Sequence, residues 1–415
     1  MSTVAKQNLN VPDLLRGALP PKVNIDELFA QFNESVEDEI EQLVKLRDAG
    51  NPVIPDVTFS QLCKSGFSRE LAQSVRRRGC VIVRGVYEVS QVQRWNDDLD
   101  RYLAANRYYE NLQADIDAGI ADRAKHVHML DIFWSKPQTE IRQSSNLKTL
   151  LQQLNGLWKI NAAGPGAFDP DSSYTYADRI RIRQPFDSKH GLSPHVDNCS
   201  MESWFSSNTI SNAYSILFNG QWQDFDAFDS KRAITDRKPH PDSCGVFRTY
   251  QGWMALTPQG EDCGSLQLVP SSRCVAWMFL SMLKDAAEGD SLVSPLPSEA
   301  YMLHPDRHAT LAKGLCSLPL LKQGDTVWWH PDAVHAVEQF NRTELPSSVV
   351  YLGSAPKCER NRQYAQSQLN RFIKGESPPD YPGVHVEANY IGRATQKDLT
   401  TIGLEQMGLD QVALV

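Results

Sequence analysis

The spacing of apolar residues predicts helices in the first part of the chain. Between residues 25 and 46 they recur at intervals of three and four with acidic residues between them, the pattern of a helix that buries one face. Asn24 is a suitable N-cap, and Gly50 and Pro52 are expected to end this helix. A second run with the same spacing contains Val92, Trp95, Leu99, Tyr102 and Leu103. We therefore expect a mainly helical flank over residues 23–160.

Short apolar runs predict strands in the rest of the chain. The run at 80–86 is rich in β-branched residues and bounded by glycines, which indicates a buried strand. Further strand-like runs separated by Gly, Pro, Asp and Ser lie at 174–183, 213–218, 245–256, 264–269, 325–329 and 348–352. Many short strands at irregular intervals are typical of an antiparallel sandwich or jelly roll.

These patterns suggest one structural domain with several parts. We expect a polar leader over residues 1–22, the helical flank, and a strand-rich core over 161–375. A polar and aromatic stretch at 204–244 interrupts this core as an insertion, and a tail follows at 376–415. Beyond Cys358 the chain is predicted to be helical at first, over 360–372, and loop-like afterwards.

Composition excludes several classes of protein. With 415 residues, of which 41% are hydrophobic, the chain can bury a sizeable core. A net charge of −8 argues against nucleic acid as a partner. No apolar stretch is long enough to span a membrane, and no signal peptide is visible at the N-terminus. The eight cysteines are scattered without a CxxC pair, which indicates neither a zinc ribbon nor a disulfide framework. We expect a cytoplasmic protein with reduced thiols; its oligomeric state is not indicated.

Histidine and aspartate residues form a candidate metal site. His195 and Asp197 lie two residues apart, so on a strand their side chains share one face. His335 follows an apolar strand much later in the chain, and His330, five residues earlier, is a competing candidate. Two histidines and one carboxylate on one face of a metal are the ligand set of non-haem Fe(II) oxygenases. The alternative for each histidine is a buried ring with no metal.

The order of these motifs resembles a known family. HVD at 195–197, ALTPQGEDCGSLQLVPSS at 255–272 and GDTVWWHPDAVH at 324–335 resemble the phytanoyl-CoA-hydroxylase-like branch of the Fe(II)/2-oxoglutarate oxygenases. With RRRGCVIVRG, YADRIRIRQP, HVDNCSMESW, CGVFRTYQGWMAL and SAPKCERNRQYA, the chain is still more similar to the YbiU-like proteins, long classed as a domain of unknown function. This resemblance extends over about residues 76–375.

The resemblance implies both a fold and an activity. It implies an α+β protein with a double-stranded β-helix (jelly roll, cupin-like) core and flanking and inserted helices. It assigns His195, Asp197 and His335 as ligands of Fe(II), with 2-oxoglutarate and O2 as co-substrates. The expected reaction oxidises an unactivated C–H bond of a small polar molecule. That molecule could be a free amino acid, and the outcome hydroxylation or a ring closure such as aziridine formation from valine.

The arginine that would bind 2-oxoglutarate is not evident from the sequence. The strand after His335, where many such oxygenases place this arginine, contains none. Candidates are Arg248, which is embedded among apolar residues, Arg181 and, third, Arg342. Arg181 belongs to a row with Arg179 and Arg183 on one face of a strand. This face either meets an anionic ligand or is an ordinary solvated surface.

Aromatic residues are expected to complete a substrate pocket. Trp204 and Tyr174 are candidates beside Arg179 and Arg183, and Tyr176 could also contact substrate, whereas Trp253 and Trp329 fit the core better. Two other functions stay open at this point. One is a metal- or sugar-binding β-sandwich without turnover, and the other is a protein hydroxylase with the same metal.

Overall fold

The computed structural model describes residues 23–119, 128–160, 167–197, 212–234, 245–287, 301–304, 306–381 and 387–409, which form a mixed α+β protein. The predicted leader at 1–22 and Trp204 lie outside these ranges. Within them, no helix combines the length and apolar character needed to cross a bilayer. The predicted first helix is confirmed as α2 (Ile25–Asp48), and Asn24 caps it by accepting a hydrogen bond from the N–H of Glu27 at 3.3 Å.

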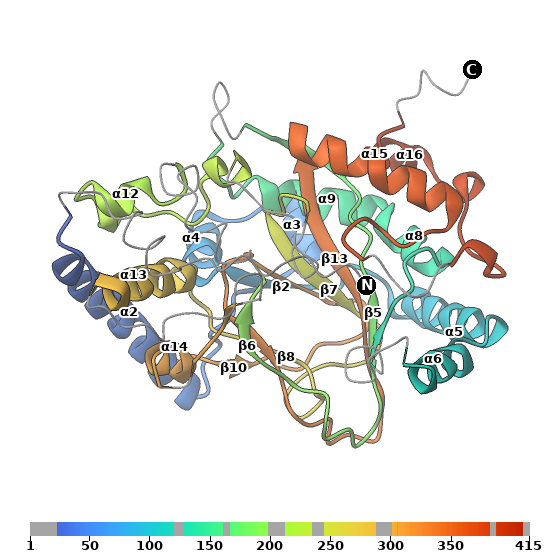
Figure 1. Cartoon of the computed structure of the whole chain (residues 1–415), viewed down its shortest axis with the longest axis horizontal. Coiled ribbons are helices and arrows are strands. Elements are labelled where there is room, and N and C mark those ends of the chain that lie inside the picture. The colour runs from blue at the N-terminus through green and yellow to red at the C-terminus, as the bar shows by residue number, and fades with distance from the viewer. Residues whose placement is uncertain are drawn as a thin grey trace.

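A large, mostly antiparallel sheet runs through the middle of the molecule (Figure 1). Its strand order is β1-β2-β11-β7-β13-β5-β3, and β4 pairs with the far end of β13. The strands are β1 (Asp56–Thr58), β2 (Cys80–Arg84), β3 (Met129–Leu130), β4 (Asp169–Tyr174), β5 (Ile180–Arg183), β7 (Tyr250–Ala255), β11 (Thr326–Trp329) and β13 (Ser347–Lys357). Only the β1–β2 pair is parallel.

A smaller five-stranded sheet has the order β10-β8-β12-β6-β9. Its strands are β6 (Leu192–Val196), β8 (Leu266–Leu268), β9 (Tyr301–Met302), β10 (Cys316–Ser317) and β12 (His335–Val337). From β5 to β8, and again from β11 to β13, successive strands alternate between the two sheets. Trp253 and Val327 of the large sheet pack in one cluster with Leu266 and Leu268 of the small sheet, so a shared core lies between the sheets.

Helices flank this pair of sheets at the left, top and right of the view in Figure 1. They are α3 (Phe59–Ser65), α4 (Arg69–Arg78), α5 (Val89–Ala105), α6 (Tyr108–Asp117), α8 (Lys136–Arg142), α9 (Ser145–Asn155), α12 (Ser215–Phe218), α13 (Cys274–Ala287), α14 (Ala309–Lys313), α15 (Glu359–Lys374) and α16 (Thr401–Gln406). The helix α13 packs along α2, and α9 packs on β4. The helices leave the interior between the sheets as the place for a site.

The structure corrects three sequence-based expectations. The chain after residue 372 was expected to be loop-like, but its described part includes the helix α16. The apolar run at 213–218 was expected to be a strand, but it contains the short helix α12; so short a run shows no period that separates the two. The run at 174–183 was expected to be one strand, but only Ile180–Arg183 forms a strand in it, β5, while Tyr174 is the last residue of β4; the two strands pair with different parts of β13. The flank over 23–160 also supplies β1, β2 and β3 to the large sheet, so it is continuous with the core.

Candidate metal centre

Two neighbouring strands of the small sheet bring three predicted ligands together. His195 of β6 lies directly opposite His335 of β12, with their ring centroids 4.2 Å apart. Asp197 follows β6, and its carboxylate oxygens lie 3.3 Å from the Nε2 atom of His195 and 3.3 Å from that of His335. One ligand atom from each of the three residues lies within 4.8 Å of the others, which is close enough to hold one metal ion.

Backbone carbonyl groups orient both imidazole rings. The Nδ1 atom of His195 lies 2.8 Å from the carbonyl oxygen of Ser193, and that of His335 lies 3.2 Å from the carbonyl oxygen of Ala333. A ring that donates its Nδ1–H to a carbonyl keeps the lone pair of Nε2 for a metal. Both Nε2 atoms face Asp197, so the two rings are oriented for metal binding.

The electrostatics of the three residues also suit a cation. Burial opposes a charge on His195, but the hydrogen bond and negative charge of Asp197 outweigh it and raise the pKa of the ring. Burial likewise opposes the charge of Asp197, yet both imidazoles hold the pKa of its carboxyl well below the usual range. Burial and the charge of His195 lower the pKa of His335. The ionised carboxylate thus stabilises positive charge at this point.

His330 does not take part in this group. Its ring is fully buried and stacks on Trp158 with centroids 5.1 Å apart. Its Nδ1 atom accepts a hydrogen bond from the N–H of Asp332 at 3.0 Å, and burial lowers its pKa to about 4. Of the two late histidines, His335 is therefore the one that meets His195 and Asp197.

A cavity of about 370 Å³ opens beside the three ligands, between the two sheets. One part of its lining is apolar and consists of Met129, Leu192, Leu266, Met302, Val337 and Leu352. The other part is polar or aromatic and consists of Tyr176, Asp178, Arg179, Arg248, Gln251, Trp329, Tyr351, Asp380 and Tyr381. A partly apolar cavity with a few converging polar groups is the usual form of a small-molecule site.

Two of the predicted arginines lie in the polar part of this lining. The guanidinium of Arg179 lies 4.7 Å from the ring centre of Tyr381, and that of Arg248 lies 5.4 Å from the ring centre of Tyr176. Asp178 pairs with Arg179 at 3.5 Å. Two cations and two carboxylates, Asp178 and Asp380, therefore face the same space.

Arg181 is not among the residues that line the cavity, although its neighbour Met129 is. It stands opposite Met129 of β3 and Val349 of β13 in the large sheet, and it is only 6% exposed. Its Nη2 atom is buried and has no hydrogen-bond partner among the described residues. Burial lowers the pKa of this guanidinium to about 10. Arg181 and Arg183 are both buried, so the solvated-surface alternative does not hold for them.

The structure does not bring three other predicted residues into the cavity lining. Arg183 is fully buried, and its guanidinium binds the carboxylate of Asp187 and backbone carbonyls, including that of Gln339 at 2.9 Å, which is a structural role. Arg342 is exposed, and it pairs with Asp262 at 3.1 Å. Tyr174 lies on β4 beside Lys357.

Several lining residues were not identified from the sequence. Gln251 donates a hydrogen bond to Asp197 at 2.6 Å, and its signal was a single amide side chain within an apolar strand. Tyr351 lies on β13, where an aromatic residue within an apolar strand does not by itself indicate a site. Asp380 and Tyr381 come from the Pro-rich tail, where no local pattern points to a site.

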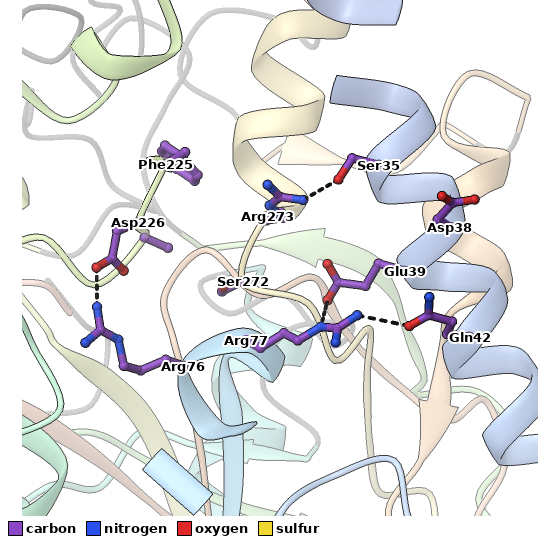
Figure 2. A pocket seen from close by; sticks show the side chains of 11 residues that line it. Ser35, Asp38, Glu39, Gln42, Arg76, Arg77, Phe225, Asp226, Ser272 and Arg273 are labelled. Carbon is purple, nitrogen blue, oxygen red and sulfur yellow. Dashed lines mark hydrogen bonds and ion pairs between the residues drawn. The ribbon is translucent and has the colours of Figure 1, made fainter. Parts of the chain in front are cut away.

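A second cavity, of about 480 Å³, lies away from the metal ligands, between α2, the end of α4 and the start of α13 (Figure 2). Its arginines pair with other residues of the lining: Arg76 with Asp226, Arg77 with Gln42 at 3.1 Å, and Arg273 with Ser35 at 2.8 Å. The three arginines of this second cavity are thus paired with other lining residues and link the helices. The cavity beside the three ligands is the better candidate site, because the candidate metal ligands line it.

Comparison with known proteins identifies the family. Residues 13–409 match the Gig2-like family. The chain belongs to this family. It is 30% identical over 391 residues to the Uncharacterized protein YbiU of Escherichia coli K12, covering 93% of each chain. This relationship agrees with the YbiU-like resemblance of the motifs.

Solved structures of Gig2-like relatives share the whole fold. A hypothetical protein, JW0805, from Escherichia coli matches with a TM-score of 0.85 at 29% identity, over 96% of this chain and 95% of the other. A Salmonella typhimurium LT2 protein, described provisionally as an oxidoreductase, matches with a TM-score of 0.86 at 28% identity, again over 96% of this chain and 95% of the other. GlcNAc Inducible Gene 2 of Candida albicans shares the fold, with 0.80 at 23% identity over 99% and 91% of the two chains.

Proposed function

We propose that this protein is a non-haem Fe(II)- and 2-oxoglutarate-dependent oxygenase that oxidises a C–H bond of a small polar substrate. The observation that carries the proposal is the group His195, Asp197 and His335, which converges from two paired strands beside a cavity. A provisional oxidoreductase description of a close structural relative is compatible with this assignment.

We assign the two sheets to a double-stranded β-helix in one structural domain. Strands β5 to β8 and β11 to β13 alternate between the sheets, which is how a jelly roll closes. In this fold the candidate ligands project from the small sheet into the interior, because β6 and β12 are neighbours with His195 opposite His335. The fold thus explains why ligands far apart in sequence meet.

The donor set fits a ferrous ion. Two imidazole nitrogens and one carboxylate bind iron while leaving other coordination positions open for further ligands. When bound, iron and 2-oxoglutarate would activate O2. This reaction would convert 2-oxoglutarate to succinate and CO2 and leave one oxygen atom to oxidise the substrate. The backbone carbonyl groups of Ser193 and Ala333 orient the two imidazole ligands.

Arg181 is the residue that best fits the distal carboxylate of 2-oxoglutarate. Its guanidinium is buried without a hydrogen-bond partner on Nη2, which is costly unless an anion pairs with it. It interacts electrostatically with Tyr351, and both Tyr351 and its ladder neighbour Met129 line the cavity. A planar guanidinium binds a carboxylate through two parallel hydrogen bonds. Arg181 on β5 would thus take the place of the 2-oxoglutarate-binding arginine that many such oxygenases have on the strand after the distal histidine, here β13.

The polar group in the lining supports a small charged or zwitterionic substrate. Arg179 and Arg248 can bind a carboxylate, and Asp178 and Asp380 can bind an amino group. A free amino acid carries both charges and is therefore our first candidate class. Hydroxylation and ring closure both remain outcomes of the same site, because they depend on small differences in the position of the target carbon.

Metal binding and co-substrate turnover test this function together. We expect the wild-type protein to bind Co(II) in calorimetry and, with Fe(II) and 2-oxoglutarate, to release succinate slowly alone and faster with its substrate. His195→Ala and Asp197→Ala should lose both properties and still unfold cooperatively. Asp98→Ala, an exposed control on α5, should behave as wild type.

Two results would contradict the proposal. If the alanine variants of the ligands keep wild-type affinity for Co(II), the metal site is elsewhere. If the wild-type protein binds the metal but never converts 2-oxoglutarate to succinate, the protein is a binding protein that keeps the fold without turnover.

A further inference from the structure

Gln251 occupies an unusual place beside the candidate metal ligands. It lies on β7, where every residue is buried, and it is only 4% exposed. In the large sheet it stands between Trp329 of β11 and Gly353 of β13, and its side chain lines the cavity. Burying an amide group costs free energy unless both of its ends are hydrogen-bonded.

One end of the Gln251 amide is bound to a metal ligand. Its Nε2 atom donates a hydrogen bond to Oδ2 of Asp197 at 2.6 Å. Asp197 lies just beyond the end of β6, so the ladder of that strand does not fix its carboxylate. The amide of Gln251 therefore limits the rotation of this carboxylate and keeps it between His195 and His335.

The other end of the amide has no partner among the described residues. The Oε1 atom of Gln251 is buried and accepts no hydrogen bond from any described residue. Exchanging the two ends would not remove the problem, because Oε1 would then face the ionised carboxylate of Asp197, and two acceptors repel. The unsatisfied atom is thus a carbonyl oxygen, which can only be satisfied by an N–H or O–H donor.

We propose that Gln251 is a positioning and specificity residue that fixes Asp197 through its amide nitrogen and accepts a hydrogen bond from a hydroxyl or amino group of the substrate through its carbonyl oxygen. This inference rests on the proposed function and narrows its substrate class. A substrate without such a donor leaves the carbonyl oxygen buried and unpaired. A site built to bind a donor group rejects analogues that lack it.

The positioning role is tested by metal affinity without any turnover. Gln251→Leu removes both hydrogen bonds at similar volume, and we expect the affinity for Co(II), measured by calorimetry on the metal-free protein, to fall about 10- to 100-fold. The visible absorption of bound Co(II) should also change. If Gln251→Leu does not fold, Gln251→Met, which is unbranched and of similar length, is measured in its place.

Gln267→Leu is the matched control for this measurement. Gln267 is also a strand glutamine with a hydrogen-bonded side chain, to Ser317 at 3.1 Å, but it does not line the cavity. It should keep wild-type Co(II) affinity. Wild-type affinity in both Gln251 variants would overturn the positioning role, whereas absence of Co(II) binding in the wild-type protein would instead overturn the proposed function.

The specificity role is tested with three small acids of the same carbon skeleton. Alanine carries an amino group, lactate carries a hydroxyl group in its place, and propionate carries neither. With Co(II) and 2-oxoglutarate bound in the absence of O2, we expect alanine or lactate to bind at least about 10-fold more tightly than propionate. Gln251→Leu should abolish this preference. Equal binding of all three, or binding of none, by the wild-type protein would overturn the specificity role.

Discussion

A buried guanidinium with an unpaired nitrogen, such as that of Arg181, lowers stability unless a ligand pairs with it. The residue is only 6% exposed, and its Nη2 atom has no hydrogen-bond partner in the described part of the chain. A buried, incompletely paired charge costs free energy that a neutral side chain of similar length does not. If Arg181 binds 2-oxoglutarate, its replacement by a neutral residue should therefore weaken the binding of 2-oxoglutarate without lowering the stability of the protein.

We expect Arg181→Met to weaken 2-oxoglutarate binding without loss of stability. Charge-assisted hydrogen bonds contribute about 1.5–3 kcal/mol, so the Kd for 2-oxoglutarate should rise about 10- to 100-fold. Calorimetry on the Co(II)-loaded protein measures this change, and thermal unfolding of the metal-free protein should show an equal or higher Tm. Arg342→Met is the exposed control. Unchanged affinity in Arg181→Met with a loss in Arg248→Met would assign the anchor to Arg248 instead.

Single residues of the site differ in how far the sequence could predict them. His195 and Asp197 could be proposed because alternation along a strand places them on one face. The choice between His330 and His335 could not, because it depends on a contact distant in sequence: the N–H of His330 binds the carbonyl of Gly79 at 2.7 Å. Gln251 was missed because only its position opposite Asp197 distinguishes it from a buried core amide.

At the scale of elements, the turn before β11 determines how the strand enters the large sheet. Gly324 has a φ of +85°, and a Cβ atom there would lie 2.2 Å from the carbonyl oxygen of Tyr87. The carbonyl of Gly324 in turn accepts a hydrogen bond from the N–H of Tyr87 at 3.3 Å. The turn thus fits closely against the segment after β2, and only glycine meets both requirements.

We expect Gly324→Ala to destabilise the protein by about 2–4 kcal/mol, because left-handed strain and a backbone clash add. Gly50→Ala is the matched control: Gly50 also has a left-handed φ, of +71°, but no atom lies within 4 Å of an added Cβ. It should cost only about 1 kcal/mol. Urea unfolding of both variants measures the difference. Equal losses would show that the close approach to Tyr87 has no energetic consequence.

Long elements were predictable and short ones were not. The helices α2, α5 and α15 extend over several turns, so their apolar period is visible in the sequence. The helix α12 is too short to show a period and was taken for a strand. The membership of β2 in the large sheet rests on its pairing with β11, which is far away in the sequence and leaves no local signal.

At the scale of the whole molecule, one buried carboxylate links the C-terminal region to the helical flank. The side chain of Glu387 accepts hydrogen bonds from the hydroxyl of Tyr102 at 2.6 Å and from the N–H groups of Phe133 at 2.7 Å and Trp134 at 3.1 Å. It is only 1% exposed. Three segments that are far apart in sequence therefore meet at one group, which no local pattern could predict.

This group should make the stability of the whole protein depend on pH. Burial raises the pKa of Glu387 to about 7 from its ordinary value of 4.5, although its hydrogen bonds oppose the shift. The folded state thus holds the proton more tightly than the unfolded state. The resulting stabilisation is complete below about pH 4.5 and is lost as the pH rises through about 7.

We expect the Glu387→Gln variant, which cannot ionise, to lack this dependence. The wild-type protein should lose about 3 kcal/mol relative to Glu387→Gln between pH 4.5 and 8, since one pKa unit corresponds to about 1.4 kcal/mol. Urea unfolding of both proteins at several pH values measures the difference, in which the other titrating groups cancel. Replacement of the half-buried Glu376, whose side chain is 42% exposed, by Gln should give no such trend. A difference between wild type and Glu387→Gln that stays constant with pH would show that the hydrogen bonds of Glu387 fully offset its burial, so that the pKa of this carboxyl is not raised.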